Sequence, residues 1–325
     1  MLAGTLAHAA QAQAQAVLTY GDTKIGIRAD AALNAPDPTA FDPSGLTGIS
    51  YIPTGYDVLA PGCPCEAWGV ADSISNTGGG TGAFTGTSNI TQVSFTSTAT
   101  TATSVTEMGS VFRVTHAFKP SGVSGVFQAD VTITNISAAT THVLYRRAMD
   151  WDMTPTAFNE YVTLQTGSAS SIVFSSDDGF ANGNPLSGPS SILTTGSFTD
   201  SGPADHGALF DFDFGTLAPG ASTSFTILYG MAADQASAIS ALTALQAEAY
   251  SLGKPDPAQT SVIPPGTPVG GPNTGIFGFK GIGGAPVFAQ PRAVPATSPV
   301  ALALGGVAML MAAFAMTWRR RFLKG

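Results

Sequence analysis

The sequence predicts an all-β protein, built as an antiparallel β-sandwich that is either one large sandwich or a double one. Only 10% of the 325 residues are charged, while Gly and Pro number 38 and 22, which is typical of short strands joined by many turns. Apolar and polar residues also alternate along several segments, as they do in strands with one buried face. One C-terminal amphipathic helix and a separate transmembrane helix complete the prediction.

Residues 1–16 are expected to be the remnant of a secretion signal. The stretch from Ala10 to Ala16 offers three overlapping Ala-Gln-Ala cleavage sites. No Lys or Arg precedes them, so the basic start of a signal is missing, and we expect translation to begin further upstream. A disordered Ala/Gln tail on a cytosolic protein is the alternative.

Residues 17–254 are predicted to form the sandwich. Period-two alternation is clear along 112–118, 129–133 and 143–151, and again along 210–214 and 225–231. His116 shares a face with Phe112, Val114 and Phe118, which indicates a histidine of the core or its rim. Thr77 to Gly82 is expected to be a flexible glycine loop.

A turn and a helix are predicted in the last part of the sandwich. Pro219-Gly220 suits the centre of a type II turn. Asp234 can cap a helix whose apolar residues recur at helical spacing to Tyr250, and Gly253 and Pro255 would end it. Residues 255–299 are then expected to be a Pro/Gly-rich segment with one short strand, 276–282, and a stalk.

Residues 300–325 are predicted to be a transmembrane tail. Val300 to Trp318 is an uncharged run of 19 residues, which as a helix would reach about 28 Å, close to one hydrocarbon core. Three arginines follow at Arg319, Arg320 and Arg321. Because positive charge belongs on the cytoplasmic side, we expect the C-terminus inside and the body outside, periplasmic or on the cell surface after processing.

The tail resembles the PEP-CTERM and IPTL-CTERM sorting signals of Gram-negative bacteria. The resemblance lies in Val294, Pro295, Ser298, Ala301-Leu302, the apolar run and Arg319 to Arg321. The tail departs from both patterns. It lacks the Pro-Glu-Pro of the PEP-CTERM signal, and it has Ala296-Thr297 and Pro299-Val300 where the IPTL-CTERM signal has Thr-Leu and Glu-Trp. The resemblance implies two partners, a membrane and a sorting protease of the exosortase type, and it implies a location without an activity.

The body carries two further resemblances. Two short segments resemble sequence motifs of bacterial surface Ig-like modules, namely Val131 to Asn135 and Leu217 to Ser222. Those modules are β-sandwiches used as spacers and adhesion domains. Tyr145 to Asp152 is similar to uncharacterised secreted bacterial proteins. Neither resemblance implies an activity.

Charge distribution argues against nucleic acid as a partner. The first 291 residues hold all 21 acidic side chains and only 8 of the 13 Lys and Arg. Such a body has no basic stripe to neutralise phosphates. Acidity outside the cell serves solubility and can also attract cations.

Several residues could carry chemistry. Cys63 and Cys65 are candidates for a disulfide in an oxidising compartment, with free buried thiols or metal ligands as alternatives. Asp150 and Asp152 share a strand face and could serve glycoside hydrolysis, or could form an acidic strand end paired with Arg146 or Arg147. Asp205 and His206 could join a serine in a hydrolase triad, but no Gly-x-Ser-x-Gly elbow occurs.

The segment from Asp177 to Asn184 concentrates oxygen donors and predicts either a calcium loop or a plain turn. Its candidate ligands are Asp177, Asp178, Asn182 and Asn184. No other cofactor is expected. Trp68 or Trp151 could stack on a sugar, although Trp151 lies on the apolar face.

The sequence therefore predicts an exported, membrane-tethered or surface-sorted envelope or matrix protein with a non-catalytic body, and extracellular polysaccharide as a candidate partner. One alternative is a carbohydrate-active hydrolase built on Asp150 and Asp152, to which Asp205 or His206 could contribute. The other is a carbohydrate-binding module.

Overall fold

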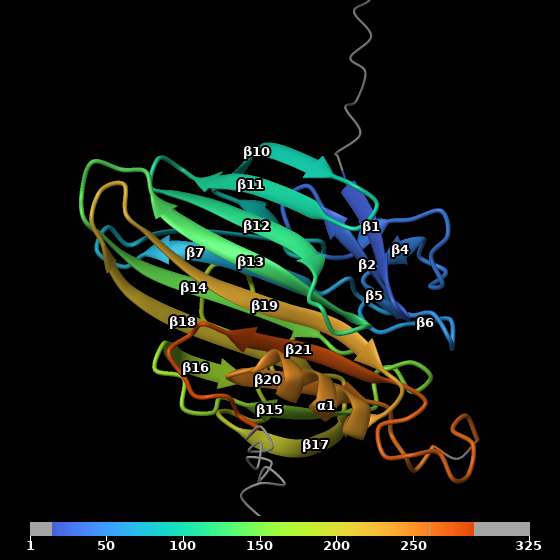
Figure 1. Cartoon of the computed structure of the whole chain (residues 1–325). Helices are drawn as coiled ribbons and strands as arrows, with labels where there is room; N and C mark the ends of the chain where they lie inside the picture. Colours follow the sequence, from blue (N-terminus) through green and yellow to red (C-terminus); the bar gives the residue numbers. More distant parts are fainter. Residues whose placement is uncertain (1–14, 260, 289–325) are drawn as a thin grey trace, which may run out of the picture. The chain divides into compact units, whose positions relative to one another are not determined.

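The computed structural model describes residues 15–259 and 261–288, and two large antiparallel sheets dominate this part of the chain (Figure 1). The larger sheet has nine strands in the order β10-β11-β12-β13-β19-β21-β20-β15-β17, and the smaller has six in the order β16-β18-β14-β7-β8-β9. The all-β, antiparallel prediction is confirmed.

The bounds in the larger sheet are β10 Ile90–Ser97, β11 Ala102–Met108, β12 Phe112–Pro120, β13 Val126–Asn135, β15 Glu160–Gln165, β17 Phe198–Ala204, β19 Ser222–Ala232, β20 Ala249–Lys254 and β21 Thr274–Lys280. Those in the smaller sheet are β7 Glu66–Asp72, β8 Thr77–Gly82, β9 Gly86–Ser88, β14 Thr141–Asp150, β16 Ile172–Ser176 and β18 Gly207–Leu217.

Aromatic side chains join the two sheets face to face. The ring of Tyr145 on β14 lies 5.0 Å from that of Phe225 on β19, and Phe210 on β18 lies 4.9 Å from Phe279 on β21. The alternating rows of β12, β13, β18 and β19 supply the core between them, as the sequence predicts. His116 is fully buried there, and its Nε2 lies 3.1 Å from the Tyr145 hydroxyl.

Two short sheets from the first 57 residues pack on the sandwich. The four-stranded one has the order β1-β2-β5-β6 and the other pairs β3 with β4. Trp68 on β7 donates its Nε1–H to the Asp30 carbonyl at 2.8 Å, which ties the six-stranded sheet to these strands. The bounds are β1 Gln15–Tyr20, β2 Thr23–Arg28, β3 Ala35–Pro36, β4 Leu46–Thr47, β5 Ile49–Tyr51 and β6 Tyr56–Asp57.

The helix is shorter than predicted. Helix α1, Gln235–Leu245, begins at the expected cap, where Asp234 accepts a hydrogen bond from the Ser237 N–H, and it ends at Gln246 in the left-handed conformation. It covers β20 and β21 through Ala238, Leu242 and Leu245 (Figure 1). The prediction that it continues to Tyr250 is wrong, because residues 249–254 form β20, which pairs on both sides and is buried throughout.

Two predicted loops are strands instead. The glycine loop at 77–82 is β8, and its glycines admit neighbouring backbone, since a Cβ on Gly80 would lie 2.4 Å from the Asn184 nitrogen. Residues 200–206 are rich in Gly, Ser and Pro, which predicts a loop with His206 at the start of a strand, but most of this stretch belongs to β17. The turn at Pro219-Gly220 is confirmed, with Gly220 at φ +76° and a hydrogen bond from the Ala221 N–H to the Ala218 carbonyl.

The sheet also extends past the expected end of the sandwich. Strand β21 lies between β19 and β20, so the predicted boundary at residue 254 falls inside the nine-stranded sheet. Most of the predicted signal remnant, the end of the stalk and the whole tail with Val294, Pro295, Ser298 and Arg319 to Arg321 lie outside the described residues. Within the described ranges, no helix has the length and apolarity to span a membrane.

Candidate functional site

A cluster of carboxylates lies where β14 ends. Asp150 is the last residue of β14, Asp152 follows two residues later, and Asp205 lies between β17 and β18. One oxygen from each lies within 4.8 Å of the other two. Asp150 and Asp152 are 1% and 0% exposed, whereas Asp205 is exposed. The cluster is therefore a buried pair with one carboxylate at the surface.

Glu160, the first residue of β15, adds a fourth acid to this cluster. It is fully buried, and its Oε1 accepts the His206 N–H at 3.1 Å. Burial, reinforced by the neighbouring carboxylates, raises the pKa of Asp150 to about 8 and the pKa of both Asp152 and Glu160 to about 9.

Glycines and a disulfide shape the surroundings of the cluster. Gly179 and Gly207 pack against Asp150, since a Cβ on either would lie within 2.7 Å of the Asp150 Cα. Cys63 and Cys65 are joined in a disulfide, and the Cys63 Sγ lies 3.7 Å from the Asp150 Oδ2. These sulfurs are therefore neither free thiols nor thiolate metal ligands.

An aromatic residue lies beside the cluster at the surface. Phe158 is 47% exposed and has a φ of +71°, in the left-handed region. Its ring packs over Gly62, where a Cβ would meet the ring at 2.5 Å and the Asp152 Oδ1 at 3.5 Å. The exposed rim of the cluster thus consists of Gly62, Phe158 and Asp205.

The predicted pairing of Asp150 or Asp152 with an arginine is wrong. Arg146 makes a bidentate pair with Asp211, at 2.6 and 2.7 Å, and Arg147 pairs with Glu66 at 2.5 Å. Arg147 and Glu66 are both fully buried. Among the described residues, no Lys or Arg is within ion-pair distance of Asp150, Asp152 or Glu160.

His206 does not assemble a hydrolase triad in the described part of the chain. It is 2% exposed, its Nδ1 lies 3.3 Å from the Asp177 Oδ2, and its buried Nε2 has no hydrogen-bond partner. Among the described residues, no serine hydroxyl makes a hydrogen bond to the ring nitrogens of His206. Trp68 and Trp151 are fully buried, so neither provides the stacking platform suggested by the sequence.

In the loop predicted to bind calcium, the oxygens make hydrogen bonds to their own chain. The Asp177 Oδ1 accepts the N–H groups of Leu193 and Thr194, at 2.9 and 3.1 Å, and Asp178 accepts both the N–H and the hydroxyl of Ser190. Asn182 and Asn184 accept N–H groups two residues further on. These contacts fit the turn alternative, and calcium binding by this loop stays a prediction.

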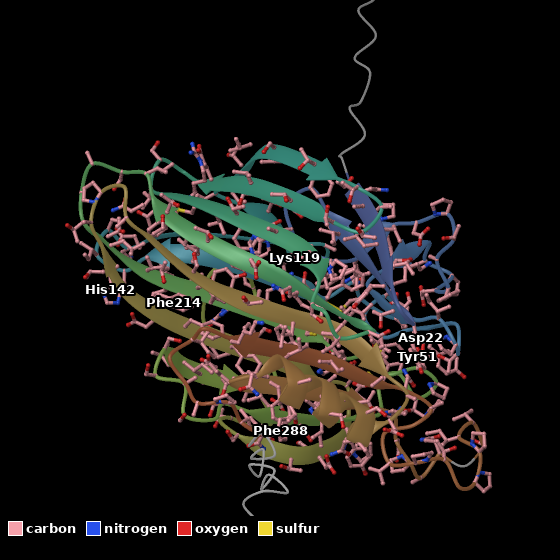
Figure 2. All side chains as sticks on the ribbon, viewed as in Figure 1. Asp22, Tyr51, Lys119, His142, Phe214 and Phe288 are labelled. Atoms are coloured by element: carbon pink, nitrogen blue, oxygen red, sulfur yellow. A yellow bond between two sulfur atoms is a disulfide. The ribbon has the colours of Figure 1, made fainter. Side chains whose placement is uncertain are left out.

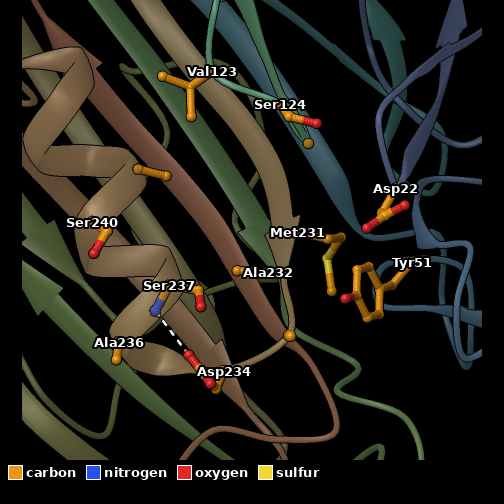
Figure 3. Close-up of a pocket in the computed structure, with 13 residues that line it drawn as sticks. Asp22, Tyr51, Val123, Ser124, Met231, Ala232, Asp234, Ala236, Ser237 and Ser240 are labelled. Atoms are coloured by element: carbon orange, nitrogen blue, oxygen red, sulfur yellow. Dashed lines mark hydrogen bonds between the residues drawn. The ribbon is translucent and has the colours of Figure 1, made fainter.

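A separate groove of about 600 Å³ lies beside α1. Asp22 and Tyr51 form one side, Ser237 and Ser240 of α1 the other, and Met231 lies between them (Figure 3). Figure 2 also shows Asp22 and Tyr51 side by side. Burial and the nearby carboxylates of Asp22 and Asp234 raise the pKa of Tyr51. The groove offers hydroxyl and carboxylate groups above an apolar floor, and none of its lining residues is Lys, Arg or His.

Sequence reasoning missed Glu160, the Glu66–Arg147 pair and the groove. The sequence could have indicated that Arg147 is buried and needs a carboxylate partner, because it occupies an inward position in the alternating row of β14. Glu160 and the groove residues come from segments far apart in the chain, so no local pattern indicates them.

Comparisons with known proteins assign no family. No family model matches the chain, and no curated protein matches it. Among solved structures, one similar chain is a protein from Escherichia coli K12 assigned as an aldose 1-epimerase, with 11% sequence identity and a TM-score of 0.33 over 85% of this chain and 89% of that one.

Proposed function

We propose that the chain is an exported carbohydrate-binding protein without catalytic turnover, whose groove beside α1 takes a neutral sugar. The groove carries the proposal. Its volume, about 600 Å³, suits a small ligand. Its carboxylates and hydroxyls can accept and donate hydrogen bonds to sugar hydroxyls, while the accessible side chains of Val123 and Ala236 offer an apolar surface to a sugar ring.

The charge of the groove favours a neutral ligand. Asp22 and Asp234 both line it, and no basic side chain balances them. An anionic glycan would meet two like charges, which are unfavourable at short range. The ligand class is therefore an uncharged mono- or oligosaccharide.

Burial of the candidate catalytic carboxyls supports a binding role. A general acid must reach the proton that it transfers, directly or through one water. Asp150 and Asp152 are at most 1% exposed, which suits a structural or ion-binding role better than contact with a polysaccharide. Export, membrane tethering and sorting by an exosortase-type protease are part of the proposal, and they are supported by the polar body and the apolar, arginine-ended tail.

Binding and turnover can be tested together. The full chain, purified in mild detergent, would be applied to immobilised neutral gluco-, galacto-, manno- and xylo-oligosaccharides, and new reducing ends would be assayed in parallel. We expect retention on one class without new reducing ends. Removing a hydrogen-bonding group with Asp22→Asn or Tyr51→Phe should weaken retention about tenfold or more, while Asp42→Asn, outside the groove, should not.

Two outcomes would refute this function. Retention on none of these glycans would overturn the binding proposal. Release of reducing ends that Asp150→Asn or Asp152→Asn abolishes would instead establish the hydrolase alternative. Location is tested independently, by cell fractionation and by sequencing both ends of the mature chain, and an intact cytoplasmic chain would contradict export.

A further inference from the structure

The buried carboxylates have the spacing of a cation site. Asp150, Asp152 and Asp205 reach one point from β14, the segment after it and the β17–β18 connection, and their nearest oxygens are within 4.8 Å of each other. Calcium binds oxygen at about 2.3–2.6 Å, so ligands on opposite sides of one ion are about 5 Å apart. A single cation can therefore touch all three.

Buried oxygens without hydrogen-bond partners are the independent observation that points to a ligand. Both oxygens of Asp152, the Oδ1 of Asp150 and the Oε2 of Glu160 are buried and have no hydrogen-bond partner. Each such acceptor pays for its desolvation without compensation. Asp152 is 0% exposed, and one of its oxygens belongs to the group that lies within 4.8 Å.

The donor set selects the class of ion. The sulfurs of Cys63 and Cys65 are bonded to each other, so the cluster supplies carboxylate oxygens and no thiolate. Oxygen-only sites suit hard cations, while Zn²⁺ is held mostly by sulfur and nitrogen. Because Asp205 is exposed, the ion has a route in from solvent.

We propose that Asp150, Asp152 and Asp205 bind one hard divalent cation, Ca²⁺, with Glu160 as a neighbouring carboxylate. The ion gives a partner to buried carboxyl oxygens of Asp150 and Asp152, and it offsets the mutual repulsion of ionised acids near which no Lys or Arg lies within ion-pair distance in the described ranges. It also joins the end of β14 to the β17–β18 connection, and so links a strand of each large sheet. This site is separate from the loop at 177–184, whose oxygens are already engaged.

The test measures ion binding directly. Full-length protein is stripped with a chelator and titrated with CaCl₂ at pH 7.5 by calorimetry, with the thermal midpoint followed in parallel. We expect one ion per chain and a midpoint that rises with Ca²⁺. Asp205→Asn, at an exposed position, should weaken the affinity at least tenfold, and Asp42→Asn should leave it unchanged.

A second variant guards against simple misfolding. Asp152→Asn replaces one of the crowded buried carboxyl groups with an amide of the same size, so we expect the chelated variant to be about as stable as the chelated parent and to lose the Ca²⁺-dependent rise. Binding of neither Ca²⁺ nor Mg²⁺ at millimolar concentration would overturn the proposal. It would also be overturned if Asp178→Asn, in the 177–184 loop, abolished binding while Asp205→Asn did not.

Discussion

Removing one partner of the buried Glu66–Arg147 pair should destabilise the protein severely. Their nearest atoms lie 2.5 Å apart and both side chains are 0% exposed. Glu66 also accepts the Leu33 N–H at 2.8 Å, and Arg147 donates to the Ala31 carbonyl at 3.1 Å. The pair therefore ties β7 and β14 to the segment that follows β2.

The magnitude follows from what each substitution leaves behind. Glu66→Gln keeps an oxygen for the Leu33 N–H but leaves a buried guanidinium without its counter-charge, which costs about 3–5 kcal/mol of unfolding free energy. Arg147→Met leaves the carboxylate unpaired and should cost a similar amount. In the double variant no charge remains, so its loss should be smaller than the sum, with a coupling of about 2 kcal/mol.

Urea unfolding, followed by tryptophan fluorescence and circular dichroism, measures these differences. Glu107→Gln provides the matched control, because Glu107 pairs with Arg113 at 2.7 Å on the surface, where such a pair contributes about 0–1 kcal/mol. Equal m-values would show that the changes are in stability alone. A Glu66→Gln variant within 1 kcal/mol of the parent, or losses that simply add, would refute the reasoning.

Three further predictions concern the fold. Burial alone would raise the pKa of Asp37, but hydrogen bonds from Lys24, Thr39 and Thr47 outweigh it and hold this pKa well below its usual value. The contribution of Asp37 to stability is therefore complete above about pH 5, roughly one unit above the pKa of an unfolded Asp, and is lost as the pH falls further. The stability difference between parent and Asp37→Asn should shrink between pH 5 and pH 2.5, and a constant difference would contradict this. Gly275→Ala should cost about 1–3 kcal/mol, because its Cβ would lie 2.4 Å from the Trp151 ring; unchanged urea unfolding would contradict the packing. A chain that stops at residue 254 should fail to fold cooperatively, since it lacks β21; a sharp thermal transition in that truncation would disprove the role of this strand.

Strands with one solvent-facing side were predictable from the sequence, because every second residue along them is apolar and buried. Strands β12 and β13 follow that rule along nearly all of their length, while β18 and β19 follow it only in part, because each also contains a run of consecutive buried residues. Strand β20 does not, since all six of its residues are buried. Its apolar residues continued the helical spacing of Leu242 and Leu245, and this led to the overlong helix. Glycines misled the prediction at β8, where they serve close packing and not flexibility.

The carboxylate cluster was only half visible in the sequence. Asp150 and Asp152 stand two residues apart and were recognised as a pair. Glu160 and Asp205 join them through the placement of β15 and β17, which no single-sequence pattern encodes. The arginines nearest in sequence were the natural partners to expect, but Arg146 and Arg147 find Asp211 and Glu66 across neighbouring strands.

The central place of β21 determines when the sandwich can be completed. Its two neighbours, β19 and β20, end at residues 232 and 254, yet they are bridged only by residues 274–280. A chain that emerges N-terminus first therefore carries two unpaired strand edges, on β19 and β20, until residues 274–280 have also appeared. The nine-stranded sheet can close only at that point.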